Sequence, residues 1–158
     1  MILQNAFKPA TIKIGLESEY KDELLEELVD ILAKDYPKDR IFPREEALRA
    51  LRKREEKMST GIYKGVAVPH ATFESIDKLR GVIGLSRNGI DFESLDGNPV
   101  YLVLMLVSPP SQAESHLEAL RQIALLIKDH LLLENLMKAT TPEKVFALIR
   151  EFEDSLNP

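Results

Sequence analysis

The feature that most constrains this chain is an unbroken apolar run from Val100 to Val107. Eight consecutive apolar residues leave no polar face for solvent, because successive side chains of a strand point to opposite faces. Such a run predicts a central strand of a sheet that is covered on both sides. It is too short for a membrane-spanning helix, which needs about 20 apolar residues. Pro109 and Pro110 close the run, so the core is expected to be built around this strand.

Strand and helix patterns alternate along the rest of the chain, which predicts a layered α/β domain. Apolar alternation and short apolar stretches indicate strands over residues 11–16, 66–68 and 79–85. Apolar periodicity between proline breaks indicates helices over about 19–36, 43–57, 112–127, 131–138 and 142–152. No repeat or linker interrupts this order, and 158 residues suit one domain. We therefore expect a single α/β domain over residues 1–158.

Composition excludes several classes of function. The chain has no cysteine, which excludes disulfides, zinc–thiolate sites, iron–sulfur clusters and cysteine nucleophiles. Its 26 acidic and 21 basic residues give a net charge of −5, which argues against nucleic acid as the main partner. The N-terminal sequence lacks the basic start and apolar stretch of a signal peptide. A cytoplasmic protein without direct membrane insertion is therefore expected.

Common nucleotide and hydrolase motifs are missing as well. There is no GxxxxGK[ST], GxGxxG, GxSxG or HExxH pattern, so a nucleotide-dependent kinase or a serine hydrolase is poorly supported. His130 and Glu134 have the i,i+4 spacing of a metal pair, but two ligands without a third make a weak site. His130 is therefore interpreted as structural, and neither a metal nor a cofactor is expected.

His70 is the first candidate for chemistry. It ends the segment Gly65–His70, in which a short strand and the rigid Pro69 aim it into an irregular loop over residues 71–78. Sites in α/β sheets usually form at the ends of strands. Imidazole can carry a proton or a phosphoryl group near neutral pH. The alternative is a half-exposed loop histidine without a role.

His116 is the second candidate. Ser111-x-x-Glu114 has the form of a capping box, which places His116 in the first turn of the following helix. The positive end of a helix lowers a histidine pKa, and its free N–H groups favour an anion such as phosphate. A surface histidine near a helix start is the alternative. The predicted core stripe of the same helix is Leu117, Leu120, Ile123, Ala124 and Ile127.

Three further residues complete a possible phosphate-binding group. Arg54 precedes Ser59 and Thr60, and arginine holds phosphate through a planar two-bond fork. The alternative for Arg54 is a place on a solvated helix face of mixed charge. Together a nucleophilic His70, a neutral supporting His116, Arg54 and two hydroxyls could surround a phosphoryl group. Transfer of a phosphoryl group requires positioning and charge stabilisation. No metal is needed when the donor and the acceptor are phosphohistidine or phosphocysteine proteins.

An ordered series of segments resembles the enzyme IIA domain of the mannitol/fructose class of the bacterial phosphoenolpyruvate-dependent sugar phosphotransferase system. The segments are Arg54-Glu55, Ser59-Thr60-Gly61-Ile62, Gly65-Val66-Ala67-Val68-Pro69-His70, Ile90-Asp91-Phe92, Leu95-Asp96-Gly97-x-Pro99-Val100, Val103–Val107 and His116-Leu117-x-x-Leu120. The resemblance covers about residues 11–152, which is the expected core of the domain. It implies a mixed central β-sheet with α-helices packed on both faces.

The resemblance also implies roles for individual residues. His70 would be the phosphorylated residue, His116 would support it, and Arg54 would contact phosphate. The donor would be the histidine-containing phosphocarrier protein. The acceptor would be an enzyme IIB component that serves mannitol- or fructose-type sugar uptake.

Two other functions stay open from the sequence. The chain carries no fused IIB, IIC or phosphocarrier domain, and a stand-alone IIA resembles the nitrogen-regulatory branch, whose members control target proteins by their phosphorylation state. Tyr63 stands where family members often have a small residue, and Ala71 stands where they often have glycine or arginine, so the partner is left open. The third function is an interaction domain without the chemistry, against which the presence of His70, His116 and Arg54 argues. The sugar, the oligomeric state and the acceptor nitrogen of His70 are not fixed by these residues.

Overall fold

The central strand of the structure is β6 (Val100–Ser108), which carries the apolar run. The other strands of the computed structural model, which describes residues 1–157, are β1 (Ile12–Ile14), β2 (Gly61–Tyr63), β3 (Val66–Ala67), β4 (His70–Thr72) and β5 (Arg80–Ile90). On one side β6 pairs antiparallel with β5, and on the other it pairs parallel with β3 and β4. β1 is parallel to β5 at one edge, and β2 is antiparallel to β3 at the other.

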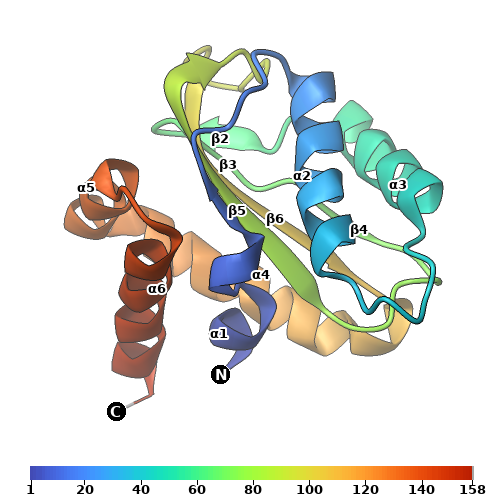
Figure 1. The fold of residues 1–158 in the computed structure, drawn as a ribbon. Coiled ribbons are helices and arrows are strands. Elements are labelled where there is room, and N and C mark those ends of the chain that lie inside the picture. The colour runs from blue at the N-terminus through green and yellow to red at the C-terminus, as the bar shows by residue number, and fades with distance from the viewer. Residues whose placement is uncertain (158) are drawn as a thin grey trace.

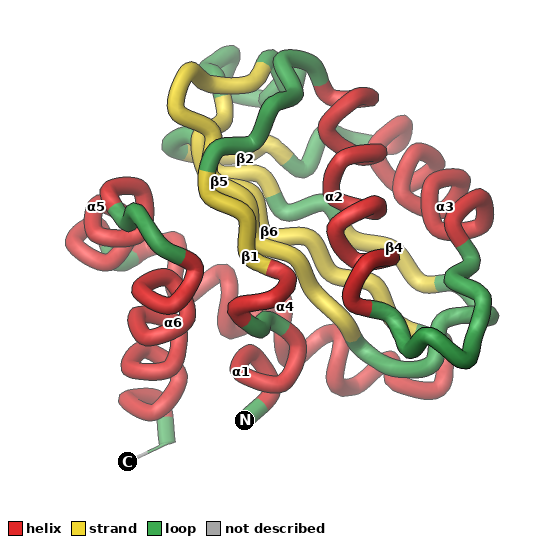
Figure 2. The backbone as a smooth tube through the Cα atoms, in the orientation of Figure 1, coloured by secondary structure: helices red, strands yellow, loops and turns green. Residues whose placement is uncertain are grey.

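Helices cover both faces of this mixed sheet (Figure 1). One face is covered by α2 (Lys21–Asp35) and α3 (Arg44–Lys57). The other is covered by α1 (Ile2–Ala6), α4 (Ala113–Lys128), α5 (His130–Lys138) and α6 (Pro142–Leu156). Figure 2 shows the yellow strands between these two groups of red helices. The predicted fold class, a single α/β domain with helices on both faces of a mixed sheet, is thus confirmed.

The side chains of β6 alternate between two hydrophobic cores, as the apolar run predicts. Leu102, Leu104 and Leu106 point toward α1, α4, α5 and α6. Val103, Met105 and Val107 point toward α2 and α3. All of these side chains are fully buried. None of the helices within residues 1–157 combines the length and the hydropathy that a bilayer crossing requires.

Four strands differ from the sequence-based expectation, and β2, at Gly61–Tyr63, was not predicted as a strand at all. β1 is shorter than predicted, because a 3₁₀ turn (η1, Pro9–Thr11) precedes it. β5 extends to Ile90, across a register shift that follows Leu85. The segment after His70 was expected to be a loop, yet His70–Thr72 forms β4, whose partners are residues 106–108 of β6. Three residues are too few to show a periodic pattern, so only the pairing with β6 defines this strand.

The start of α4 also differs. A 3₁₀ turn (η2, Pro110–Gln112) precedes the helix, and the N-cap residue is Gln112 rather than Ser111. The Gln112 side-chain oxygen accepts a hydrogen bond from the Leu79 N–H at 2.8 Å, so it ties η2 to the start of β5. The predicted capping box at Ser111 is therefore wrong, whereas His116 lies in the first turn of α4 as predicted.

A buried carboxylate joins the first and last helices. Glu153 on α6 is 1% exposed, and its carboxylate accepts hydrogen bonds from the N–H groups of Leu3 and Gln4 at 2.8 and 3.0 Å. These donors lie in the first turn of α1, where N–H groups have no partner inside the helix. Phe7 follows α1 and packs on Gly81, where any side chain would overlap the Phe7 ring. α1 is thereby fixed to the sheet although it is short.

We expect Glu153→Ala to lower the free energy of unfolding by about 1–3 kcal/mol, because it leaves buried N–H groups without an acceptor. Urea denaturation followed by circular dichroism measures the loss. Glu151→Ala, at an exposed position on the same helix, is the matched control and should change the free energy by less than about 0.5 kcal/mol. Equal losses in the two variants would contradict the capping role of Glu153.

Candidate functional site

His70 takes its position from an interruption in the strand pairing along β6. β3 and β4 both pair with β6, and Val68 and Pro69 separate them. Pro69 has no N–H to contribute to the sheet. Beside this break, His70 Nδ1 lies 2.8 Å from the Val68 carbonyl oxygen. A carbonyl only accepts hydrogen bonds, so Nδ1 carries the proton and Nε2 keeps its lone pair.

His116 approaches His70 from α4. The two ring centroids are 5.8 Å apart, and the ring planes are inclined by 58°. His116 Nδ1 lies 2.6 Å from the hydroxyl oxygen of Ser108, the last residue of β6. Its Nε2 is therefore the ring nitrogen left for another partner. Both histidines line the same hollow, so the structure brings together the two histidines singled out in the sequence.

Both imidazoles are held neutral near pH 7. Burial is the largest cause that lowers the pKa of His70 below its ordinary value of 6.5. The hydrogen bond to the Val68 carbonyl raises this pKa, and the positive charge of Arg54 lowers it further. Burial also lowers the pKa of His116, and the neighbouring His70 adds to this effect. The direction for His116 is the one expected from the sequence, although burial rather than the helix end is its main cause. A neutral His70 has a nucleophilic Nε2.

The hollow in front of the histidines carries positive charge. It has a volume of about 320 Å³ and is lined by Ala50, Lys53, Arg54, Lys57, His70, Ala71, Thr72 and His116. Arg54 lies in the last turn of α3, and its guanidinium donates to the Met58 carbonyl at 2.9 Å. This bond holds the side chain while further N–H donors of the fork are left for an anion. An arginine and two lysines beside neutral imidazoles suit a phosphoryl group.

Ser59 and Thr60 lie next to His70 but do not line the positive hollow. Thr60 is buried, and both its hydroxyl and its N–H donate to the Glu55 carboxylate. Lys21 pairs with the same carboxylate at 3.1 Å. The Ser59 hydroxyl accepts from the Gly61 N–H at 3.1 Å. In this arrangement both hydroxyls hold the loop between α3 and β2. Both residues also line a neighbouring hollow together with Arg54 and His70, and their contact with a phosphate stays a prediction.

An apolar hollow of about 270 Å³ borders the other side of His70. Its apolar lining consists of Met58, Ile62, Val68, Leu120, Ile123, Ala124 and Ile127. Ala124 is exposed, and Leu117 is 69% exposed, although the sequence pattern assigned both to the core of α4. That part of the prediction is wrong, whereas Ile123 and Ile127 of the predicted stripe are buried. The buried residues of α4 are His116, Ala119, Gln122, Ile123, Leu126 and Ile127. α4 therefore presents apolar surface beside His70 as well as toward the core.

Sequence reasoning missed three side chains that hold the site. Glu55 and Lys21 form the buried ion pair under the α3–β2 loop, and neither could be separated from ordinary charged helix residues by pattern. Ser108 orients His116. A signal for Ser108 did exist, because it is the first polar residue after the apolar run and ends a strand that is buried on both faces.

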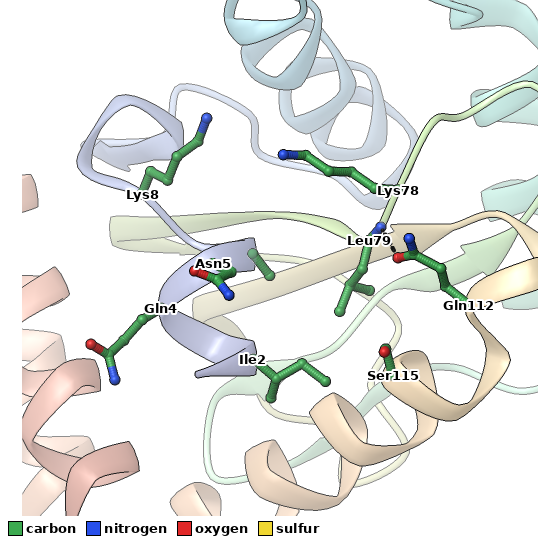
Figure 3. A pocket seen from close by; sticks show the side chains of 9 residues that line it. Ile2, Gln4, Asn5, Lys8, Lys78, Leu79, Gln112 and Ser115 are labelled. Atoms are coloured by element: carbon green, nitrogen blue, oxygen red, sulfur yellow. Dashed lines mark hydrogen bonds between the residues drawn. The ribbon is translucent and has the colours of Figure 1, made fainter.

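A separate hollow of about 450 Å³ lies between α1 and the start of α4 (Figure 3). Its labelled residues include Lys8, Lys78 and Ser115, and the dashed line marks the bond between Leu79 and Gln112. Lys8 pairs with Asp35 at 2.7 Å. None of the site residues predicted from the sequence lines this hollow. The chemistry-bearing residues are thus gathered at the positive hollow.

His130 lies apart from this group of residues. Its Nε2 is 2.9 Å from Lys64 Nζ, while Glu134 pairs with Lys138 at 2.7 Å, so the i,i+4 metal pair is not formed. Within residues 1–157, no group of three or more histidine or acidic side chains has an arrangement that could hold a metal.

The fold is that of an enzyme IIA component. The crystal structure of nitrogen regulatory protein IIA-Ntr from Neisseria meningitidis matches with a TM-score of 0.86 and 26% identity, over 94% of this chain and 99% of that chain. The complex of enzyme IIA mannitol and phosphorylated enzyme IIB mannitol from Escherichia coli matches with a TM-score of 0.75 and 20% identity, over 92% of this chain and 97% of that chain. The second likeness supports the fold alone.

The chain belongs to the family described as phosphoenolpyruvate-dependent sugar phosphotransferase system, EIIA 2, whose model matches residues 5–152. The fructose-specific EIIABC component of Bacillus subtilis (strain 168) is 32% identical over 143 residues, which are 90% of this chain and 22% of that protein. The nitrogen regulatory protein of Pseudomonas aeruginosa is 28% identical over 153 residues, 96% of this chain and 97% of that protein. This chain thus spans about a fifth of the first relative and nearly all of the second. The resemblance found in the sequence is confirmed.

We expect His70→Gln to raise the pKa of His116, because it removes the neighbouring ring whose charge lowers that pKa. Burial should still keep the value below 6.5. Titration of the ring C–H resonances by NMR between about pH 4 and pH 8 covers the range in which histidines change charge. His130→Gln is the control and should leave His116 unchanged, since His130 contacts Lys64. A wild-type His116 pKa above 6.5, or no response to His70→Gln, would contradict this electrostatic picture.

Proposed function

We propose that the chain is a cytoplasmic phosphohistidine carrier of the phosphotransferase system. It accepts a phosphoryl group on His70 from the histidine-containing phosphocarrier protein and passes it to an enzyme IIB component for mannitol- or fructose-type uptake. The observation that carries this proposal is the bond from His70 Nδ1 to the Val68 carbonyl, which leaves a neutral Nε2 beside Arg54 and His116. The carrier unit is the single domain expected over residues 1–158.

Transfer in this site requires only the chain's own side chains. The Nε2 lone pair of His70 attacks the phosphorus of the donor phosphohistidine. The P–N bond of the donor breaks with its electron pair on the donor nitrogen, and a P–Nε2 bond forms. The phosphorylated ring keeps its proton on Nδ1, so it becomes cationic, and the Val68 carbonyl stabilises it. Arg54, Lys53 and Lys57 offset the negative charge of the phosphoryl oxygens.

The apolar hollow provides the contact surface for the partner proteins in this proposal. It borders His70, so a partner seated on it brings its own phosphorylated or acceptor residue to Nε2. An apolar patch next to a reactive group is typical of a surface that associates with other proteins. Contact there also excludes water from the transferring group, which limits hydrolysis.

The second candidate function is regulation of a target protein by the phosphorylation state of His70. The observation that favours it is the match with the Pseudomonas aeruginosa nitrogen regulatory protein along 97% of that protein. A phosphoryl group adds about −1.5 to −2 charge, which can strengthen or break a protein interface. Both functions use the same acceptor residue.

His70→Gln should abolish phosphorylation, because no other side chain in the site presents a neutral nitrogen with a free lone pair and a fixed opposite proton. The measurement is intact-mass spectrometry at alkaline pH after incubation with phosphoenolpyruvate, enzyme I and the phosphocarrier protein. Wild type should gain one phosphoryl group. His130→Gln, which changes an exposed histidine away from the site, should be labelled like wild type. Full labelling of His70→Gln would overturn the carrier proposal.

Ala124→Glu should weaken docking of the phosphocarrier protein, because it places a carboxylate in the apolar hollow. We expect the KM for the phosphocarrier protein to rise about tenfold with little change in kcat, the effect of losing roughly 1.4 kcal/mol of binding. Leu125→Glu is the matched control, since Leu125 is exposed on the same helix and does not line the hollow. An equal rise in KM for both variants would contradict docking at this hollow.

The transport and regulatory functions are separated by the fate of the phosphoryl group. The labelled protein should lose it to an enzyme IIB component if it serves uptake. A regulatory role is supported instead if a target protein binds wild type and phosphorylated wild type with different affinity in a pull-down or by calorimetry.

A further inference from the structure

We infer that Ser108 is a positioning residue that fixes His116 as the tautomer with its proton on Nε2, and so provides a hydrogen-bond donor for the phosphoryl group on His70. This inference rests on the proposed function. Ser108 is the last residue of β6 and is fully buried, and its hydroxyl oxygen lies 2.6 Å from His116 Nδ1. The Phe73 N–H donates to the Ser108 carbonyl at 3.1 Å, which holds the backbone at this point.

The proton between Ser108 and His116 has two arrangements. In one, the hydroxyl donates to Nδ1, and Nε2 carries the ring proton. In the other, Nδ1–H donates to the hydroxyl oxygen, and the hydroxyl proton then needs a different acceptor. Within residues 1–157 the Ser108 hydroxyl has no hydrogen-bond partner besides His116 Nδ1. A buried donor without an acceptor is costly, so the first arrangement is favoured by about tenfold or more.

The two histidines therefore have opposite tautomers. The Val68 carbonyl keeps the proton of His70 on Nδ1, so its Nε2 presents a lone pair. The Ser108 hydroxyl keeps the proton of His116 on Nε2, so this nitrogen presents an N–H. With ring centroids 5.8 Å apart and both rings lining one hollow, a phosphoryl group on His70 Nε2 lies within reach of that N–H.

The opposite tautomer of His116 would work against the reaction. Its Nε2 would present a lone pair to the phosphoryl oxygens, and both are acceptors that repel each other. A protonated His116 would also donate, but burial and the neighbouring His70 lower its pKa and keep it neutral near pH 7. The neutral ring with Nε2–H is the form that donates without adding a charge.

The direct test is long-range ¹H–¹⁵N NMR of the unphosphorylated protein, which distinguishes a protonated from an unprotonated ring nitrogen. In wild type we expect His116 Nε2 to be protonated and Nδ1 to be unprotonated. Ser108→Ala should give a mixture of tautomers. Ser111→Ala, which removes an exposed hydroxyl on the neighbouring η2 turn, is the matched control and should behave like wild type. A wild-type His116 with its proton on Nδ1 would overturn the inference.

The second readout is the rate of phosphorylation by the phosphocarrier protein. Ser108→Ala should slow it by about three- to tenfold, the effect of losing one hydrogen bond in the transition state. Ser108→Thr restores a hydroxyl and should restore both the tautomer and most of the rate. An unchanged rate in Ser108→Ala with a changed tautomer would overturn the role in transfer. Phosphorylation of the His70→Gln variant would overturn the proposed function. The NMR measurement of the His116 tautomer does not depend on that result.

Discussion

The pairing of β6 with two short strands on one side is the constraint on which the site depends. The Leu106 N–H of β6 donates to the Pro69 carbonyl at 3.0 Å, whereas the Val68 N–H donates to the Thr60 carbonyl, so the backbone groups of Val68 face away from β6. Val68 and Pro69 separate β3 from β4, and the Val68 carbonyl meets His70 Nδ1. The same central strand ends at Ser108, which meets His116 Nδ1. One buried strand therefore lies beside the segment whose carbonyl orients His70, and its own last residue orients His116.

Much of this arrangement follows from the sequence. The apolar run of β6 predicted a strand covered on both faces. His70, His116 and Arg54 were grouped from the sequence around one phosphoryl group, and the structure has all three lining one hollow. The partners that fix the tautomers could not be predicted in the same way. The role of Val68 depends on its carbonyl, which no residue type encodes, and β4 exists only because β6 lies beside it. Periodicity describes faces of isolated elements, whereas these contacts arise between elements.

The surface around His70 divides into a positive hollow and an apolar one, and the apolar hollow explains an error in the sequence-based reading. Counting apolar residues on α4 assigned Leu117 and Ala124 to the core, yet both are exposed. An apolar periodic pattern shows which helix residues are apolar, but it does not show how many of them the neighbouring sheet can cover. Ala124 lies beside His70 at the apolar hollow, where a second protein can cover it, and Leu117 is exposed on the same helix. An apolar residue that is predicted to be buried but is exposed next to a reactive side chain therefore indicates a surface that binds another protein.

In the proposed function, the chain must release its phosphoryl group as readily as it accepts it, and the polar groups near His70 suit this requirement. The hydroxyl of Thr60 is committed to Glu55, and that of Ser59 accepts from Gly61. If the Thr60 hydroxyl turned to the phosphoryl group, it would stabilise the phosphorylated ground state as well as the transition state, and release would slow. The donors left are Arg54, the two lysines, the Ser59 O–H and, in the inferred tautomer, the Nε2–H of His116, and Arg54 already shares its fork with the Met58 carbonyl. Moderate stabilisation from few donors is what a reversible relay between two proteins requires.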